Sequence, residues 1–66
     1  MSVAKTIEIS ADSAESFEDA VRQGIAKASQ TVHGMSGAFV KEQLVTIAND
    51  QVQVYRVHLM ITFALD

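Results

Sequence analysis

The sequence predicts an α+β fold with the element order β-α-β-β, in which a three-stranded antiparallel sheet packs against one helix. Three observations support this class. The segment Val52–Leu65 alternates apolar with more polar residues along its whole length, which is the two-residue period of a half-buried strand. The segment Phe17–Val32 repeats its apolar residues every three or four positions, which is the period of an amphipathic helix. The length of 66 residues predicts a single domain over residues 1–66.

The first strand is expected near the start of the chain. Its residues alternate between two sets, Val3, Lys5, Ile7 and Ile9 on one side and Ala4, Thr6, Glu8 and Ser10 on the other. The small, polar segment Ser10–Glu15 is expected to be the loop into the helix. The N-terminal segment Met1-Ser2-Val3-Ala4-Lys5 lacks the apolar core of a signal peptide.

The helix is expected to begin after Ser16. A serine hydroxyl is a favoured N-cap, and the acids Glu18 and Asp19 follow it at the positive end of the helix dipole. Ser13, one turn earlier, is a competing cap.

The other end of the helix is expected at Gly34, directly after His33. His33 would then lie in the last helical turn, where a cation is favoured. Gly24 lies on the apolar stripe of the helix and indicates either a close approach to the sheet or a tolerated mid-helix glycine.

The segments Ala38–Ala48 and Val52–Leu65 are expected to form a long antiparallel hairpin around a tight turn at Asn49-Asp50, with the first strand alongside. A strand of about 12 residues is roughly 40 Å long, whereas the predicted helix spans only about 24 Å. The sheet should therefore extend beyond its helix, and the expected cover is another copy of the chain. One face of the last strand carries Tyr55, Val57, Leu59, Ile61, Phe63 and Leu65, and the half-polar face carries Val54, Arg56, His58, Met60, Thr62 and Ala64.

The composition also indicates self-association. A chain this short buries only about 60% of its unfolded surface, and small folds usually add disulfides, a metal or a partner subunit. Cysteine is absent, and 48% of the residues are hydrophobic, with a positive mean hydropathy. Such a chain is typical of a subunit that buries a second surface.

Charge and hydropathy exclude several classes of partner. The net charge is −3 and there is no basic cluster, so neither nucleic acid nor an anionic membrane is an expected partner. No apolar run approaches about 20 residues, so no segment is predicted to span a bilayer. We expect a cytoplasmic protein.

Residues typical of catalysis are few, and the chain is not expected to be an enzyme. There is no cysteine, no glycine-rich phosphate loop and no GxSxG motif. His58, on the half-polar face of the last strand, is either a ligand or ion contact or an interface or solvated histidine. Lys41 and Glu42 are expected to point to opposite faces of the second strand, and therefore not to form a pair.

Four stretches of the chain together resemble the dodecins. They lie at the helix start, at its end and in the two hairpin strands: Ser13–Ala20, Ala28–Val32, Val40–Gln43 and Tyr55–Phe63. Dodecins are small flavin-binding proteins of bacteria and archaea. The resemblance, which covers Val3 to Leu65, implies a sheet wrapped around one helix and a hollow homo-dodecamer in which neighbouring subunits bury the overhang.

The resemblance also indicates where a flavin would bind. In dodecins a tryptophan at the start of the second strand stacks on the isoalloxazine, and this position is Gly37 in a chain that has no tryptophan. The nearest aromatic residue is Phe39, two residues further on the same face, and a phenyl ring can stack with less area. Phe39 is either a flavin contact or an interface or core residue.

A second departure lies in the last strand. The glutamine that usually binds the pyrimidine edge of the flavin is matched by Arg56. An arginine has only donors, so Arg56 would reach the flavin carbonyls or pair with the phosphate of FMN.

The resemblance implies a protein that stores or buffers FMN or riboflavin. The alternative is a dodecin-like assembly that has lost flavin and binds metal ions or another small molecule. Glu42, repeated around three-fold axes, would then be the cation site, because carboxylate oxygens suit hard divalent ions. A Glu42 that faces solvent or pairs with a lysine is the other possibility.

Overall fold

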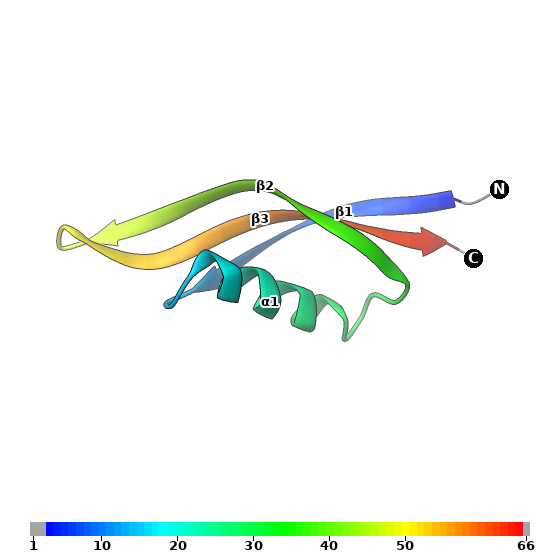
Figure 1. The fold of residues 1–66 in the computed structure, drawn as a ribbon, viewed down its shortest axis with the longest axis horizontal. Coiled ribbons are helices and arrows are strands. Elements are labelled where there is room, and N and C mark those ends of the chain that lie inside the picture. Colours follow the sequence, from blue (N-terminus) through cyan, green and yellow to red (C-terminus); the bar gives the residue numbers. More distant parts are fainter. Residues whose placement is uncertain (1–2, 66) are drawn as a thin grey trace.

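A computed structural model describes residues 3–65, and Met1, Ser2 and Asp66, the ends of the predicted domain, lie outside the described residues. The chain forms β1 (Val3–Ser13), α1 (Phe17–Ala28), β2 (Met35–Ala48) and β3 (Gln51–Leu65). Figure 1 shows the three strands as one sheet with α1 on one of its faces. The predicted β-α-β-β order is confirmed.

The central strand of the sheet is β3. The strand order is β1-β3-β2, and both pairings are antiparallel. Alternate residues of β3 face the helix, and Val57, Leu59 and Ile61 are fully buried there together with Ala20 of α1. At one end of this core, the rings of Phe17 and Tyr55 meet edge to face, with centroids 5.1 Å apart. The prediction for this face of β3 is thus confirmed at its centre.

The first strand is longer than predicted and replaces most of the expected loop. Residues 11–13 continue β1, and Asp12 pairs with Arg56 on β3. The strand ends at Ser13, which is buried. The Ser13 hydroxyl accepts hydrogen bonds from the backbone N–H groups of Glu15 and Ser16, at 2.9 and 3.3 Å. The turn into the helix is therefore only three residues long.

The start of α1 is as predicted. The Ser16 side chain accepts a hydrogen bond of 2.9 Å from the N–H of Asp19, which makes Ser16 the N-cap. Ser13, the competing cap, instead donates to the Asp19 carboxylate at 2.6 Å. The two hydrogen bonds that the Ser13 hydroxyl accepts come from N–H groups in the turn between β1 and α1, not from N–H groups inside the helix.

The end of α1 differs from the prediction. The helix ends at Ala28, with Ser29 as C-cap. Beyond Ser29, the N–H groups of Gln30 and Thr31 bond to carbonyls three residues back, so the chain tightens out of α-helical geometry. His33 therefore lies in the connecting segment rather than in a helical turn. Gly34, with a φ of 75°, directs the chain into β2.

Gly24 marks a close approach between α1 and the sheet. A Cβ atom on Gly24 would lie 3.0 Å from the Cβ of Ala11 and 3.3 Å from Leu59. Of the two interpretations of this glycine, the structure supports the close approach.

The hairpin has the predicted turn but an irregular second strand. Asn49 and Asp50 have φ values of 53° and 62°, which is the geometry of a two-residue type I′ turn. The strand β2 starts at Met35, three residues before the prediction, and its register against β3 shifts at three places. One shift, between Val40 and Glu42, is a bulge at Lys41.

The sheet extends beyond its helix, as predicted. The chain measures 51 × 20 × 14 Å, whereas a helix of 12 residues is only about 18 Å long. Figure 1 shows the β2–β3 turn projecting past α1 at one end of the sheet, and the start of β1 and the end of β3 projecting at the other. In the described part of the chain, no helix is long and apolar enough to cross a membrane.

Candidate functional site

The candidate site lies on the face of the sheet turned away from α1 (Figure 1), here called the open face. The strand alternation that buries Val57 and Leu59 under the helix directs the intervening residues to this face. Its central members are Glu8 and Asp12 on β1, Arg56, His58 and Met60 on β3, and Gly37, Phe39, Lys41 and Glu42 on β2. All four predicted site residues lie here.

The aromatic candidate, Phe39, is exposed to solvent. It pairs with Met60 on β3, and 61% of its surface is accessible. Phe39 is therefore not a core residue within one subunit. Gly37, two residues earlier, pairs with Thr62, and a Cβ at this position would meet no atom within 4 Å.

The second candidate, Arg56, is held by Asp12 on the neighbouring strand. Its Nε and Nη2 donate to the two Asp12 carboxylate oxygens at 2.7 and 3.0 Å, a bidentate contact. These hydrogen bonds hold the pKa of the Asp12 carboxyl below its usual range, and the carboxylate in turn raises the pKa of Arg56.

The structure does not bring Phe39 and Arg56 into contact within one chain. Phe39 pairs with Met60, and Arg56 lies four residues further along β3, which corresponds to about 13 Å at 3.3 Å per residue. A ligand that contacts both would have to span this distance or bridge two subunits.

The third candidate, Glu42, is paired with a histidine. Its Oε1 lies 2.9 Å from Nδ1 of His58. The neighbouring Lys41 reaches across the sheet to Glu8 on β1, with Nζ 3.1 Å from Oε1. Both Lys41 and Glu42 therefore lie on the open face, and the prediction that they point to opposite faces is wrong, because the bulge at Lys41 adds a residue to β2 and breaks the alternation.

No set of three or more His, Asp or Glu residues that could hold a metal ion occurs within residues 3–65 of one chain. The carboxylate of Glu42 is nevertheless accessible, with 59% of the side chain exposed. A three-fold cation site would draw one Glu42 from each of three subunits, so Glu42 stays a prediction.

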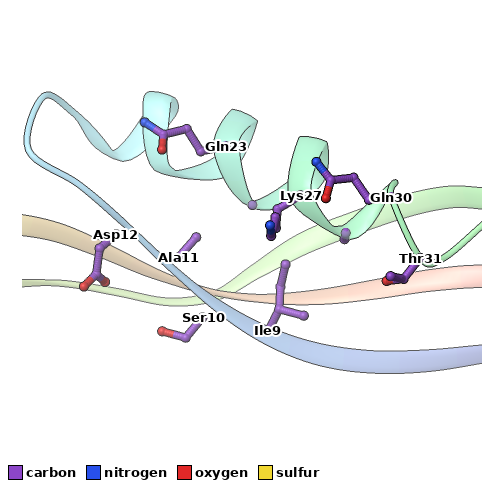
Figure 2. Close-up of a pocket in the computed structure, with 10 residues that line it drawn as sticks. Ile9, Ser10, Ala11, Asp12, Gln23, Lys27, Gln30 and Thr31 are labelled. Atoms are coloured by element: carbon purple, nitrogen blue, oxygen red, sulfur yellow. The ribbon is translucent and has the colours of Figure 1, made fainter.

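The ion pair of Asp12 with Arg56 is not predicted from the sequence, which places Asp12 in a loop. The signal was present: the even-numbered residues Glu8, Ser10 and Asp12 continue the polar side of the β1 alternation. Figure 2 shows Ile9 and Ala11 directed toward α1, while Ser10 and Asp12 are directed to the other side.

A separate groove of about 640 Å³ lies between β1 and α1. Figure 2 shows its lining, with the side chains of Gln23, Lys27 and Gln30 on the helical side. Gly37, Phe39, Glu42 and Arg56 do not line it, so the groove is distinct from the predicted site.

The fold and the candidate site thus describe an elongated β-α-β-β subunit with an exposed aromatic residue and an ion pair on its open face. The dodecin family model matches residues 3–66. The chain belongs to the dodecin family.

Solved structures agree with this assignment. The chain is 32% identical to a tryptophan-to-phenylalanine mutant of the T. thermophilus dodecin, with a TM-score of 0.93 and coverage of 100% of this chain and 98% of the other. For the dodecin of Streptomyces davaonensis, the identity is 29%, the TM-score 0.94 and the coverage 98% and 96%. A calcium dodecin from Mycobacterium tuberculosis, described as having a novel calcium-binding site, is 28% identical, with a TM-score of 0.86 and coverage of 97% and 91%. No curated protein matched the chain.

Proposed function

We propose that this protein binds FMN or riboflavin and stores or buffers it, as a hollow homo-dodecamer in the cytoplasm. The observation that carries the proposal is Phe39, which is 61% exposed on the open face of the sheet. An exposed phenyl ring can stack against the flat isoalloxazine of a flavin and contributes about 0.5–1.5 kcal/mol beyond the burial of area.

Binding would need more than one copy of the chain. The distance between Phe39 and Arg56 along the sheet means that one subunit supplies the aromatic contact and polar contacts at separate places. Pairing of subunits would bring a second aromatic ring to the other face of the flavin or to a second flavin. Stacking of this kind quenches flavin photochemistry, and no substrate is turned over.

Two comparisons support the proposal. Dodecins are binding and storage proteins rather than enzymes, and this chain belongs to that family. The similar dodecin that carries a phenylalanine in place of a tryptophan shares the fold of this chain, so a phenylalanine is compatible with a dodecin subunit.

The flavin proposal is tested by changing the aromatic surface. Gly37→Trp should tighten flavin binding by about tenfold, because the indole adds stacking area and the position is open, with no atom within 4 Å of an added Cβ. Phe39→Trp should also tighten binding, and Phe39→Ala should weaken it by about 1 kcal/mol. The measurement is quenching of flavin fluorescence on titration with each variant. A flavin affinity that is the same in the wild-type protein and in every variant at Phe39 and Gly37 would contradict the proposal.

A second candidate function is the binding of a divalent cation at Glu42. It is favoured by the exposed Glu42 carboxylate and by the similarity to a dodecin described as calcium-binding. Three Glu42 carboxylates around a three-fold axis would repel one another, and a calcium or magnesium ion between them would relieve this repulsion.

The cation proposal predicts a metal-dependent melting temperature. A chelator should lower the melting temperature, and added calcium or magnesium should raise it, because the ion joins three subunits. Glu42→Gln should abolish both effects while leaving flavin affinity nearly unchanged. Glu18→Gln is the matched control, since Glu18 pairs with Arg22 on the exposed face of α1. A wild-type melting curve insensitive to chelator and to both metals would exclude the ion site.

A further inference from the structure

Asp12 and Arg56 together present hydrogen-bond donors and acceptors at one place on the open face. They are direct partners across β1 and β3, and their side chains are 41% and 37% exposed. The bidentate contact uses two of the five N–H donors of the guanidinium. The guanidinium keeps three further donors and the carboxylate keeps unused lone pairs, and both side chains are partly exposed.

This combination is complementary to the pyrimidine end of a flavin. That end is an imide, in which the N3–H group is flanked by two carbonyl oxygens. A protein that binds it must therefore supply an acceptor for the N3–H group and, beside it, a donor for a carbonyl oxygen. An arginine alone has no acceptor, and a carboxylate alone has no donor. Joined as they are here, the two side chains offer both.

We propose that Asp12 is a specificity-determining residue of the flavin site: its carboxylate accepts the flavin N3–H while Arg56 donates to a neighbouring flavin carbonyl. The inference rests on the proposed flavin binding and adds the residue that selects the imide edge. The ion pair also holds both side chains in place before the ligand arrives, which lowers the entropy cost of binding.

A purely structural ion pair is the competing explanation. Exposed ion pairs contribute little to stability, and β1 offers a matched example in Glu8, which also faces the open side and pairs with a cation, Lys41, at 3.1 Å. Glu8 therefore provides a control that removes the same charge from the same strand without touching Arg56.

The experiment compares riboflavin with N3-methylriboflavin, which lacks the N3–H donor. Fluorescence titrations are made with the wild-type protein, Asp12→Ala and Glu8→Ala, each first shown by sedimentation to have the same assembly mass. The wild-type protein should bind riboflavin about tenfold more tightly than the methylated analogue. Asp12→Ala should lose this preference, by weakening riboflavin and leaving the analogue nearly unchanged. Glu8→Ala should keep the preference.

Three results would overturn the inference. They are a wild-type protein that binds both flavins equally, an Asp12→Ala variant that keeps the preference, and an Asp12→Ala variant that weakens both ligands by the same factor. In each case flavin binding itself would stand. A wild-type protein that binds neither flavin would instead overturn the proposed function. If Asp12→Ala does not assemble, Asp12→Thr gives the same comparison, because threonine favours strands and also lacks the carboxylate.

Discussion

Asp12 and Arg56 form an ion pair whose contribution to stability depends on pH. The hydrogen bonds from Arg56 hold the pKa of Asp12 below its usual value in the folded protein. In the unfolded chain an aspartate titrates near pH 3.9. The folded state therefore binds the proton of Asp12 less readily than the unfolded state does, and protonation favours unfolding.

Because the pKa of Asp12 is lowered in the folded protein, the ion pair with Arg56 should weaken in acid. The small contribution of this exposed pair to the stability should be fully present above about pH 5 and be lost as the pH falls below about 4 and through the folded pKa. Asp12→Asn should thus unfold more readily than the wild-type protein at neutral pH, and the difference should vanish in acid. Urea unfolding at several pH values measures this. A difference that stays constant down to about pH 2 would contradict the assignment.

At the scale of the secondary structure elements, the close approach of α1 to β1 depends on Gly24. Gly24→Val would place a side chain where a Cβ alone lies 3.0 Å from Ala11. Ala11 cannot rotate out of the way, so the helix must move, at a cost of about 1–3 kcal/mol. Ala26→Val on the exposed face of the same helix is the control, with a propensity cost below about 1 kcal/mol. The midpoint of urea unfolding should fall more for Gly24→Val, and equal losses would mean that the approach tolerates a side chain.

The sequence predicts the secondary structure elements themselves more accurately than it predicts where they end. The long alternation around Val57, Leu59 and Ile61 predicts β3 and its buried face, because a period of two residues is typical of a half-buried strand. The helical period, which Val32 still fits, predicts an end of α1 about one turn later than the structure shows. The chain has already tightened out of α-helical geometry after Ser29.

The site was predicted unevenly for similar reasons. Face and strand were predicted for Phe39 and Arg56, and the structure places both on the open face. The Asp12–Arg56 pair depends on residues 44 positions apart, and such pairing follows from register rather than from local pattern. The bulge at Lys41 has no glycine or other sequence marker, so the common face of Lys41 and Glu42 was not predictable.

At the scale of the whole molecule, one chain leaves much apolar surface uncovered. Its accessible surface is 4734 Å², whereas a compact monomer of 7.2 kDa has about 4100 Å². The excess includes large apolar side chains far from α1: Ile47 is 65% exposed and Val52 is 50% exposed near the projecting turn of the hairpin. These side chains are expected to be covered by neighbouring copies.

The corresponding prediction concerns mass in solution. Sedimentation equilibrium or native mass spectrometry should give about twelve copies of the 7.2 kDa chain. Ile47→Asp should shift the population toward smaller species, because it places a charge in the expected contact. Glu18→Gln, on the exposed face of α1, should leave the mass unchanged. A stable monomer at micromolar concentration would contradict the assembly.

The irregular register of β2 has a consequence for the chain before it assembles. Both β1 and β2 are edge strands, and an edge strand with a regular row of free backbone groups is a template for aggregation. Three register shifts interrupt β2, whereas β1 pairs with β3 without a shift from Val3 to Ser13. Bulges twist an edge and break its row of hydrogen-bonding groups. A newly made subunit therefore exposes one regular edge instead of two, which disfavours its stacking into fibrils.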